Sequence, residues 1–150
     1  MAQSLTKIVV HVVFSTKNRE PLLTAVVRND FFAYTVGILN SLDCITLAIN
    51  GTEDHIHGLI VMSKTISLSK MMEEMKGGSS RWLNSHTAVK GHFAWQAGYG
   101  AFSVSESQIS KVVNYIKGQE EHHRKATFQD ELVMLLKKHR IEFDKQHLWT

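Results

Sequence analysis

The stretch that decides the fold is CITLAINGTEDHIHGLIVM, residues 44–62. Residues 44–49 form a short apolar and β-branched run, which favours a strand, and residues 54–62 read as the returning strand. Asn50-Gly51 between them is a typical signal for a tight hairpin turn. The stretch therefore predicts an antiparallel β-hairpin around which the remaining elements are arranged.

A strand and a helix are predicted before this hairpin. Residues 5–15 are apolar on both faces and rich in β-branched side chains, as expected of a central strand. Pro21 is suited to the first turn of a helix. Apolar positions then recur at helical spacing along one face. They are Leu23, Val27, Phe31, Tyr34, Ile38 and Leu42.

A helix and a strand are predicted after the hairpin, followed by two more helices. Ser67 is a candidate cap for a helix that Gly77-Gly78 should weaken in its middle. Residues 93–104, with glycines at the centre, predict a bent or bulged strand. Ser105 with Gln108 forms a capping box for a helix, and Thr127 begins the last one. Residues 141–150 form a tail.

The order strand–helix–strand–strand–helix–strand is the ferredoxin-like, or RRM-like, split βαβ plan. We therefore expect an α+β sandwich, with one antiparallel sheet, helices on one face and additional C-terminal helices. Residues 1–150 are expected to form a single domain, because this length is typical of one. The fold alone does not define a function.

Composition narrows the class of protein. Hydrophobic residues make up 43% and charged residues 21% of the 150 residues, as in a globular domain. The single cysteine, Cys44, excludes a disulfide framework and a cysteine-based zinc site. No apolar run approaches the roughly 18 residues of a membrane span, so a cytosolic protein without a membrane partner is expected. The net charge of +3 permits a polyanionic partner without requiring one.

The first candidate for chemistry is His55-Ile56-His57. Residues two apart on a strand point to the same face, so the two imidazoles lie side by side and suit a divalent metal. The alternative is a pair of partly exposed histidines at a sheet edge. Asp54, on the opposite face, either supports one of these ligands or only stabilises the turn.

The second candidate is Tyr115 with Gln119, four residues apart on the predicted helix and projecting from one side. Both fall at the edge of the apolar stripe, where a side chain reaches a cleft. The alternative for Tyr115 is an amphipathic side chain at a core boundary. His122 and His123 read as a solvated helix end, because adjacent helical residues diverge too far to chelate one ion easily.

The third candidate is a set of basic and small polar residues. Lys17 and Arg19 follow the first strand, and Lys76 and Arg81 flank the sequence GGSS. Cations, hydroxyls and backbone amides together suit phosphate oxygens. The alternative is ordinary solvated surface charge.

Taken together, these residues resemble the single-tyrosine HUH transposases, which are small transposases of prokaryotic insertion sequences and their REP-associated relatives. The resemblance spans most of the chain. It includes VFSTK at residues 13–17, DHIHGL at 54–59, residues 76–82, the WQAGY core within 93–104, and Asn114-Tyr115-Ile116 with Gln119. The order and spacing of these matches favour functional over structural roles for four residues: His55, His57, Tyr115 and Gln119.

The resemblance implies a mechanism. His55, His57 and Gln119 would hold one Mg²⁺ or Mn²⁺, which would act as a Lewis acid on the scissile phosphate. Tyr115 would attack single-stranded DNA near a hairpin, leaving a 5′-phosphotyrosine link and a free 3′-OH that allow strand transfer without ATP. Two imidazoles and an amide carry no negative charge, so weak metal binding is expected.

The resemblance also implies a homodimer, in which the helix of residues 105–124 completes the partner's site. Lys17, Arg19, Lys76 and Arg81 are assigned to DNA phosphates, while residues 129–150 receive no catalytic assignment. Two other functions remain open. One is a non-catalytic module that binds nucleic-acid hairpins on an RRM-like sheet, and the other is a metal-dependent phosphodiesterase that uses water as the nucleophile.

Overall fold

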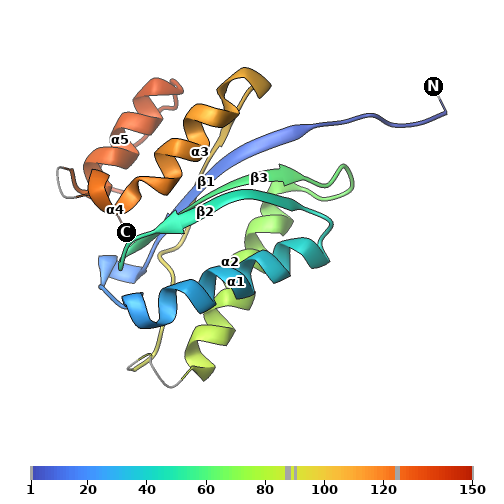
Figure 1. Cartoon of the computed structure of the whole chain (residues 1–150). Coiled ribbons are helices and arrows are strands. Elements are labelled where there is room, and N and C mark those ends of the chain that lie inside the picture. The colour runs from blue at the N-terminus through green and yellow to red at the C-terminus, as the bar shows by residue number, and fades with distance from the viewer. Residues whose placement is uncertain (1, 87–88, 90, 124–125, 150) are drawn as a thin grey trace.

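The computed structural model describes residues 2–86, 89, 91–123 and 126–149. Its centre is a four-stranded antiparallel sheet (Figure 1). The strands are β1 (Ile8–Ser15), β2 (Ile45–Gly51), β3 (His55–Met62) and β4 (Gly100–Ser103), in the spatial order β2-β3-β1-β4. The predicted α+β plan, with one antiparallel sheet and helices, is confirmed.

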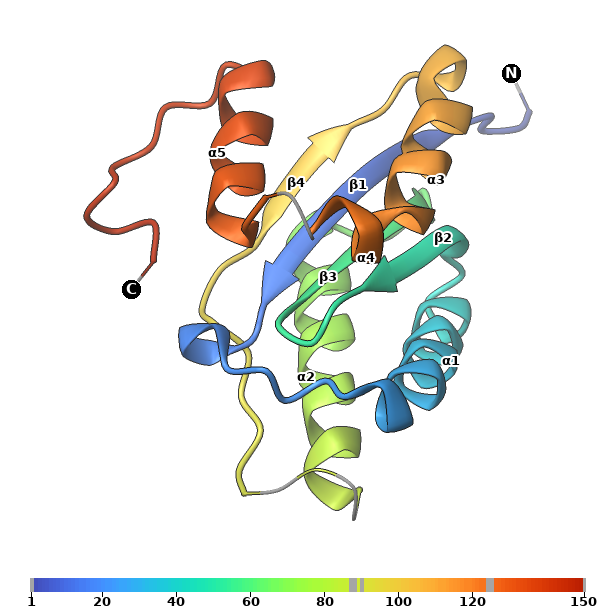
Figure 2. The same ribbon diagram turned by 60° about the vertical axis from the view of Figure 1, so that its left-hand side comes forward.

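Helices cover both faces of this sheet (Figures 1 and 2). On one face lie α1 (Ala25–Ser41) and α2 (Leu68–Ser85). On the other lie α3 (Ile109–Lys117), α4 (Gln119–His122) and α5 (Phe128–Lys138). Two short 3-10 turns, η1 (Lys17–Arg19) and η2 (Glu106–Gln108), follow β1 and precede α3. No described helix is long and apolar enough to span a membrane.

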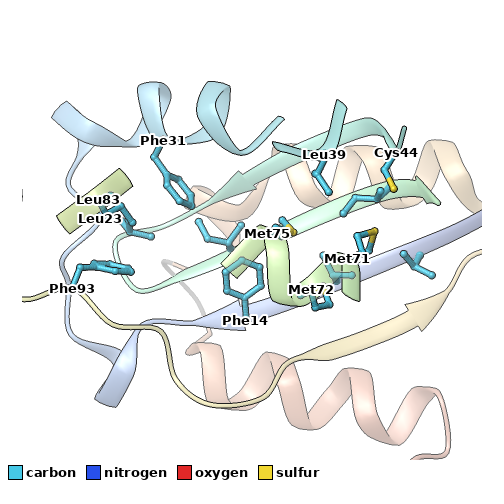
Figure 3. Close-up of a cluster of buried hydrophobic side chains, with 14 of the residues drawn as sticks. Phe14, Leu23, Phe31, Leu39, Cys44, Met71, Met72, Met75, Leu83 and Phe93 are labelled. Atoms are coloured by element: carbon cyan, nitrogen blue, oxygen red, sulfur yellow. The ribbon is translucent and has the colours of Figure 1, made fainter. Parts of the chain in front are cut away.

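Successive residues of a strand point to opposite faces of the sheet, and each face packs against its own helices. Val10, Val12 and Phe14 of β1 point toward α1 and α2, together with Ile56 and Ile60 of β3. The resulting core contains large aromatic and sulfur-containing side chains, including Phe31, Met71, Met72, Met75 and Phe93 (Figure 3). The odd-numbered residues of both strands face α3, α4 and α5 instead. Residues 55 and 57 therefore belong to that second face.

The hairpin turn lies at Glu53-Asp54, three residues beyond the predicted Asn50-Gly51. Asn50 and Gly51 still pair with His57 and Ile56, and the turn is closed by the Thr52 N–H donating to the His55 carbonyl at 3.0 Å. A Cβ at position 51 would lie 2.2 Å from that carbonyl oxygen. The glycine therefore permits close approach of two backbones and does not form the turn.

One prediction about the helices before the final strand is wrong, and one glycine of the second helix has a packing role that the sequence did not indicate. The first helix begins at Ala25 and not at Pro21, because Thr24 is the residue with the extended backbone of an N-cap. Gly77 and Gly78 do not interrupt α2. A Cβ at Gly78 would lie 2.7 Å from Cδ1 of Ile38, so this glycine lets α2 pack closely on α1.

The final strand and the helix after it are also shorter than predicted. Of residues 93–104, only Gly100–Ser103 pair as a strand with β1, and Trp95 forms one isolated bridge to Thr16. The Ser105 side chain does not cap, and the chain passes through η2 before α3 begins. The predicted helix of residues 105–124 is divided at Gly118 into α3 and α4, and its predicted last residue, Arg124, lies outside the described residues.

Candidate active site

His55 and His57 lie side by side on β3, with no exposed surface. The strand is an interior one, since β2 and β1 pair with it on either side, and His55 and His57 oppose Ser15 and Val13 of β1. The alternative of partly exposed histidines at a sheet edge is therefore wrong. Burial lowers the pKa of His57, which favours the neutral imidazole that a metal ion requires.

The end of α3 is fixed to the sheet next to these histidines. Asn50 of β2 donates from Nδ2 to the carbonyl oxygens of Ile116 and Lys117 at 3.0 and 3.1 Å. These carbonyls belong to the last turn of α3 and need partners, because the helix ends at Gly118. The contact sets the position of Tyr115 and of the residue that follows the break, Gln119.

The four side chains singled out from the sequence meet within one chain. His55 Nε2 lies 3.2 Å from Oε1 of Gln119, which is itself fully buried. The rings of His57 and Tyr115 are 5.8 Å apart between centroids. Tyr115 thus lies beside the histidines of its own chain.

Two further residues enter this cluster from the C-terminal part of the chain. The carboxylate of Glu131, on α5, accepts hydrogen bonds from His57 Nε2 at 2.7 Å and from the Tyr115 hydroxyl. His123 donates from Nε2 to the same carboxylate at 3.1 Å, so its assignment to a solvated helix end is wrong. Sequence reasoning missed Glu131, although its place among Phe128, Leu132 and Leu135 on the inward face of α5 was a signal.

His55 and His57 each have a hydrogen-bond partner at the Nδ1 atom. His11 of β1 places Nε2 at 2.7 Å from Nδ1 of His57, and Oδ1 of Asp54 lies 2.7 Å from Nδ1 of His55. Asp54 therefore does more than stabilise the turn. Such partners fix the ring orientation and tautomer of a ligand, so both Nε2 atoms are presented toward α3 and α5.

The electrostatics of the cluster centre on one buried anion. Burial alone would raise the pKa of Glu131, but hydrogen bonds from His123 and His57 hold it well below the ordinary value. Burial raises the pKa of Tyr115, and the adjacent Glu131 carboxylate raises it further. The resting site therefore contains an ionised carboxylate and a protonated tyrosine hydroxyl.

The residues fit a divalent cation. One ligand atom from each of His55, His57, His123 and Glu131 lies within 4.8 Å of the others. Neutral imidazoles and a carboxylate are suitable ligands for a divalent first-row metal. The amide oxygen of Gln119, next to His55 Nε2, is an additional oxygen donor in the same place.

Two clefts flank the cluster. One, of about 480 Å³, is lined by residues including Arg19, Asp54, His123 and Thr127. The other, of about 620 Å³, lies between α3 and α5 and includes Lys111, Tyr115 and Lys138. A polymer can thus approach the buried cluster from two sides, each with basic residues.

The four predicted DNA-binding residues have different environments. Lys17 and Arg81 are exposed, and the Arg19 guanidinium lies 5.7 Å from the ring centroid of Trp149. Lys76 donates from Nζ to the carbonyls of Gln96 and Gly98 at 2.9 and 2.6 Å, and burial lowers its pKa. Lys76 therefore already holds the loop before β4.

Comparisons with known proteins identify the family and the fold. A family model described as IS200-like transposase matches residues 4–119. A crystal structure of a candidate transposase from Deinococcus radiodurans R1 is 21% identical, with a TM-score of 0.59, covering 77% of this chain and 93% of that one. None of the curated proteins matches the sequence.

A second solved structure is a REP-associated tyrosine transposase bound to a REP hairpin. It is 13% identical, with a TM-score of 0.61, and the match covers 81% of this chain and 72% of that one. At these identities the two structures establish a shared fold, and the family model establishes the family.

Proposed function

Since the chain belongs to the IS200-like transposase family, we propose that it cuts and rejoins single-stranded DNA with Tyr115 as nucleophile and His55, His57 and Gln119 as metal ligands. The observation that carries the proposal is the convergence of these four side chains in one buried cluster. A tyrosine hydroxyl beside a pair of metal-ligating imidazoles is suited to phosphoryl transfer.

The chemistry follows from the position of Tyr115. Its oxygen forms a bond to the phosphorus while the bond from phosphorus to the 3′-oxygen breaks, and the leaving oxygen takes up a proton. The product is a 5′-phosphotyrosine and a free 3′-OH, and the reverse reaction joins a new strand. A bound Mg²⁺ or Mn²⁺ would supply Lewis-acid stabilisation of the phosphate charge.

Glu131 prepares the nucleophile in this scheme. Its carboxylate accepts the hydrogen bond of the Tyr115 hydroxyl, which fixes the oxygen next to His57. Because the pKa of Tyr115 is raised, the hydroxyl is protonated at rest and loses its proton only as it attacks. The Glu131 carboxylate, whose pKa is held low, orients this hydroxyl as a hydrogen-bond acceptor.

DNA is proposed to reach the site along the basic clefts. Ser15 pairs with His55, so the η1 turn with Lys17 and Arg19 follows β1 close to the site, and Arg19 lines the cleft beside His123. By analogy with the relative bound to a REP hairpin, we extend hairpin binding to this chain. Lys17, Arg19, Lys76 and Arg81 are the proposed phosphate contacts.

A homodimer is also proposed. The edge strand β2 exposes Ile45 at 59% and Leu47 at 37%, and an edge strand offers unpaired backbone groups to a second copy. Light scattering after size-exclusion chromatography tests this proposal, with Leu47→Lys expected to give monomers. A wild-type protein that is monomeric and still cleaves DNA would contradict it.

The proposed reaction is tested by a covalent-adduct assay. The protein is incubated with labelled single-stranded DNA libraries that carry hairpins, with Mn²⁺ or with EDTA, and analysed on a denaturing gel. We expect a metal-dependent protein–DNA band that Tyr115→Phe abolishes without loss of DNA binding. Binding without any band would favour a non-catalytic module, and cleavage that survives Tyr115→Phe would favour water as nucleophile.

Phosphate contacts are tested separately by salt dependence. Alanine at one contacting position should lower the magnitude of the salt slope of hairpin binding by about 1. We expect this for Lys17, Arg19, Lys76 and Arg81. Alanine variants at all four positions with unchanged affinity and slope would contradict the assignment.

A further inference from the structure

The C-terminal helix α5 inserts a carboxylate into the histidine cluster. Glu131 is 2% exposed, one turn after the Thr127 side chain caps the helix by accepting from the Asp130 N–H. Leu132, Leu135 and Leu136 on the same helix pack against Val13 and Phe102 of the sheet. This packing directs Glu131 at the face of β3 that bears the two histidines.

The distances around Glu131 match those between ligands of one ion. Oε1 lies 2.7 Å from His57 Nε2, 3.1 Å from His123 Nε2 and 3.6 Å from His55 Nε2. Adjacent ligands of an octahedral cation bound at about 2.1 Å are separated by about 3 Å. Glu131 is therefore placed where a small movement allows it to share a cation with all three histidines.

The charge of the ligand set is a second reason to place Glu131 at the cation site. His55, His57 and Gln119 are neutral ligands, a poor set for a hard divalent cation. Glu131 adds the carboxylate that this set lacks, with Oε1 facing the Nε2 atoms of His57 and His123. In the structure the histidine N–H groups donate to this carboxylate, and a bound cation would take their place.

We propose that Glu131, together with His55, His57 and His123, forms an anionic ligand set for the divalent cation, with Mn²⁺ preferred over Mg²⁺. The preference follows from ligand type, because imidazole suits transition metals better than it suits Mg²⁺. This inference rests on the proposed function, since it adds ligands to the same metal site. It also assigns a catalytic part to α5, which lies outside the residues that match the family model.

The second oxygen of Glu131 connects the ligand set to the nucleophile. Oε2 accepts from the Tyr115 hydroxyl while Oε1 faces the imidazoles. One carboxylate thus spans the cation site and the attacking oxygen. Glu131 fixes the distance between them, and its loss affects both metal binding and the placement of Tyr115.

The test is a metal titration without DNA. Isothermal titration calorimetry and the electron paramagnetic resonance of free Mn²⁺ are measured on the wild type, Glu131→Gln and the control Glu142→Gln, a glutamate that is exposed beyond α5. We expect Glu131→Gln to weaken Mn²⁺ binding at least tenfold, comparable to the loss of a metal-site partner. Glu142→Gln should bind as the wild type does, and so should Glu131→Gln if the proposal is wrong.

A second variant covers the case in which Glu131→Gln fails to fold. In Glu131→Cys the thiolate is a soft ligand, so Cd²⁺ should bind more tightly than to the wild type and give a sulfur-to-cadmium charge-transfer band. Glu142→Cys is the matched control, because it contains Cys44 and one introduced cysteine at an exposed position. Its Cd²⁺ spectrum gives the signal expected without the proposed site. A folded Glu131→Cys protein whose Cd²⁺ spectrum equals that of Glu142→Cys would overturn the assignment.

The adduct assay separates this inference from the proposed function. If Glu131→Gln forms the Tyr115 adduct with the same Mn²⁺ dependence as the wild type, the inference is overturned and the function stands. If Mn²⁺ binding requires Glu131 but the wild type forms no adduct on any substrate, the ligand set stands and the function is overturned.

Discussion

His11 is the buried partner of His57, so its replacement tests whether the metal centre depends on the orientation of that ring. The two nitrogens are 2.7 Å apart, and His11 is 4% exposed. Burial lowers the pKa of His11 to about 3, and the neighbouring His57 adds to this effect. His11 is therefore neutral at physiological pH, and a neutral imidazole nitrogen either donates or accepts according to its tautomer.

The hydrogen bond must reverse when a cation binds. In the structure His57 donates from Nε2 to the Glu131 carboxylate, so its Nδ1 accepts from His11. Binding a cation through Nε2 moves the His57 proton to Nδ1, which must then donate to His11. The imidazole of His11 can donate this hydrogen bond before the cation binds and accept it afterwards. Leucine, of similar size, can do neither.

The expected magnitude has two parts. Loss of a partner behind a metal-ligating histidine weakens metal binding by about 10- to 100-fold. Leaving a buried nitrogen without its hydrogen bond costs about 1–3 kcal/mol of folding free energy. For a domain of this size that lowers Tm by about 2–4 °C for each kcal/mol.

The assay combines calorimetric Mn²⁺ titration with thermal unfolding. His11→Leu should lose both affinity and stability, His11→Gln should recover part of each because its amide can donate or accept, and the exposed control His92→Leu should change neither. A folded His11→Leu protein that binds Mn²⁺ as tightly as the wild type would refute the reasoning.

Two further predictions concern the hairpin and the C-terminal part of the cluster. Gly51→Ala places a Cβ 2.2 Å from the His55 carbonyl oxygen, so it should cost about 1–3 kcal/mol and weaken Mn²⁺ binding. Gly37→Ala on α1 meets nothing within 4 Å and should stabilise by up to about 1 kcal/mol, and equal unfolding temperatures for the two variants would contradict this account. Burial alone would lower the pKa of His123, but Glu131 raises it above 6.5, so the stabilisation by His123 is full below that pH and is lost as pH rises through the raised value. In metal-free protein, His123→Asn should therefore destabilise more at about pH 5.5 than at about pH 9 in denaturant titrations, and a pH-independent difference would show that this ion pair is not the cause.

The sequence predicted the order of strands and helices because those patterns are local. Each apolar run overlaps the strand or helix that it predicts. Ser67 and Thr127 lie directly before the helices that they begin. Gly51 was misinterpreted because the strand register, and not the Asn-Gly pair, sets the turn and brings Gly51 against the His55 carbonyl. The role of Gly78 was missed because it is required by a close approach to Ile38, far along the chain, and that contact leaves no local pattern.

The candidate site divides in the same way. His55 with His57 and Tyr115 with Gln119 are each recognisable from short spacing on one element. His11, His123 and Glu131 come from three distant segments, and each has an ordinary local interpretation, as a strand residue, a helix end and one residue of an amphipathic helix. The pairing of β1 with β3 brings His11 to His57, and the packing of α5 on the sheet brings Glu131, with His123 bonded to it, to the same place.

Mass spectrometry of the covalent product identifies the attacking residue. After the reaction with hairpin DNA and Mn²⁺, nuclease and trypsin are applied, and Tyr115 is found in the peptide between Lys111 and Lys117. We expect this peptide to carry a nucleotide joined through its 5′-phosphate to Tyr115. A nucleotide attached to another residue, or cleaved DNA with this peptide unmodified, would contradict it.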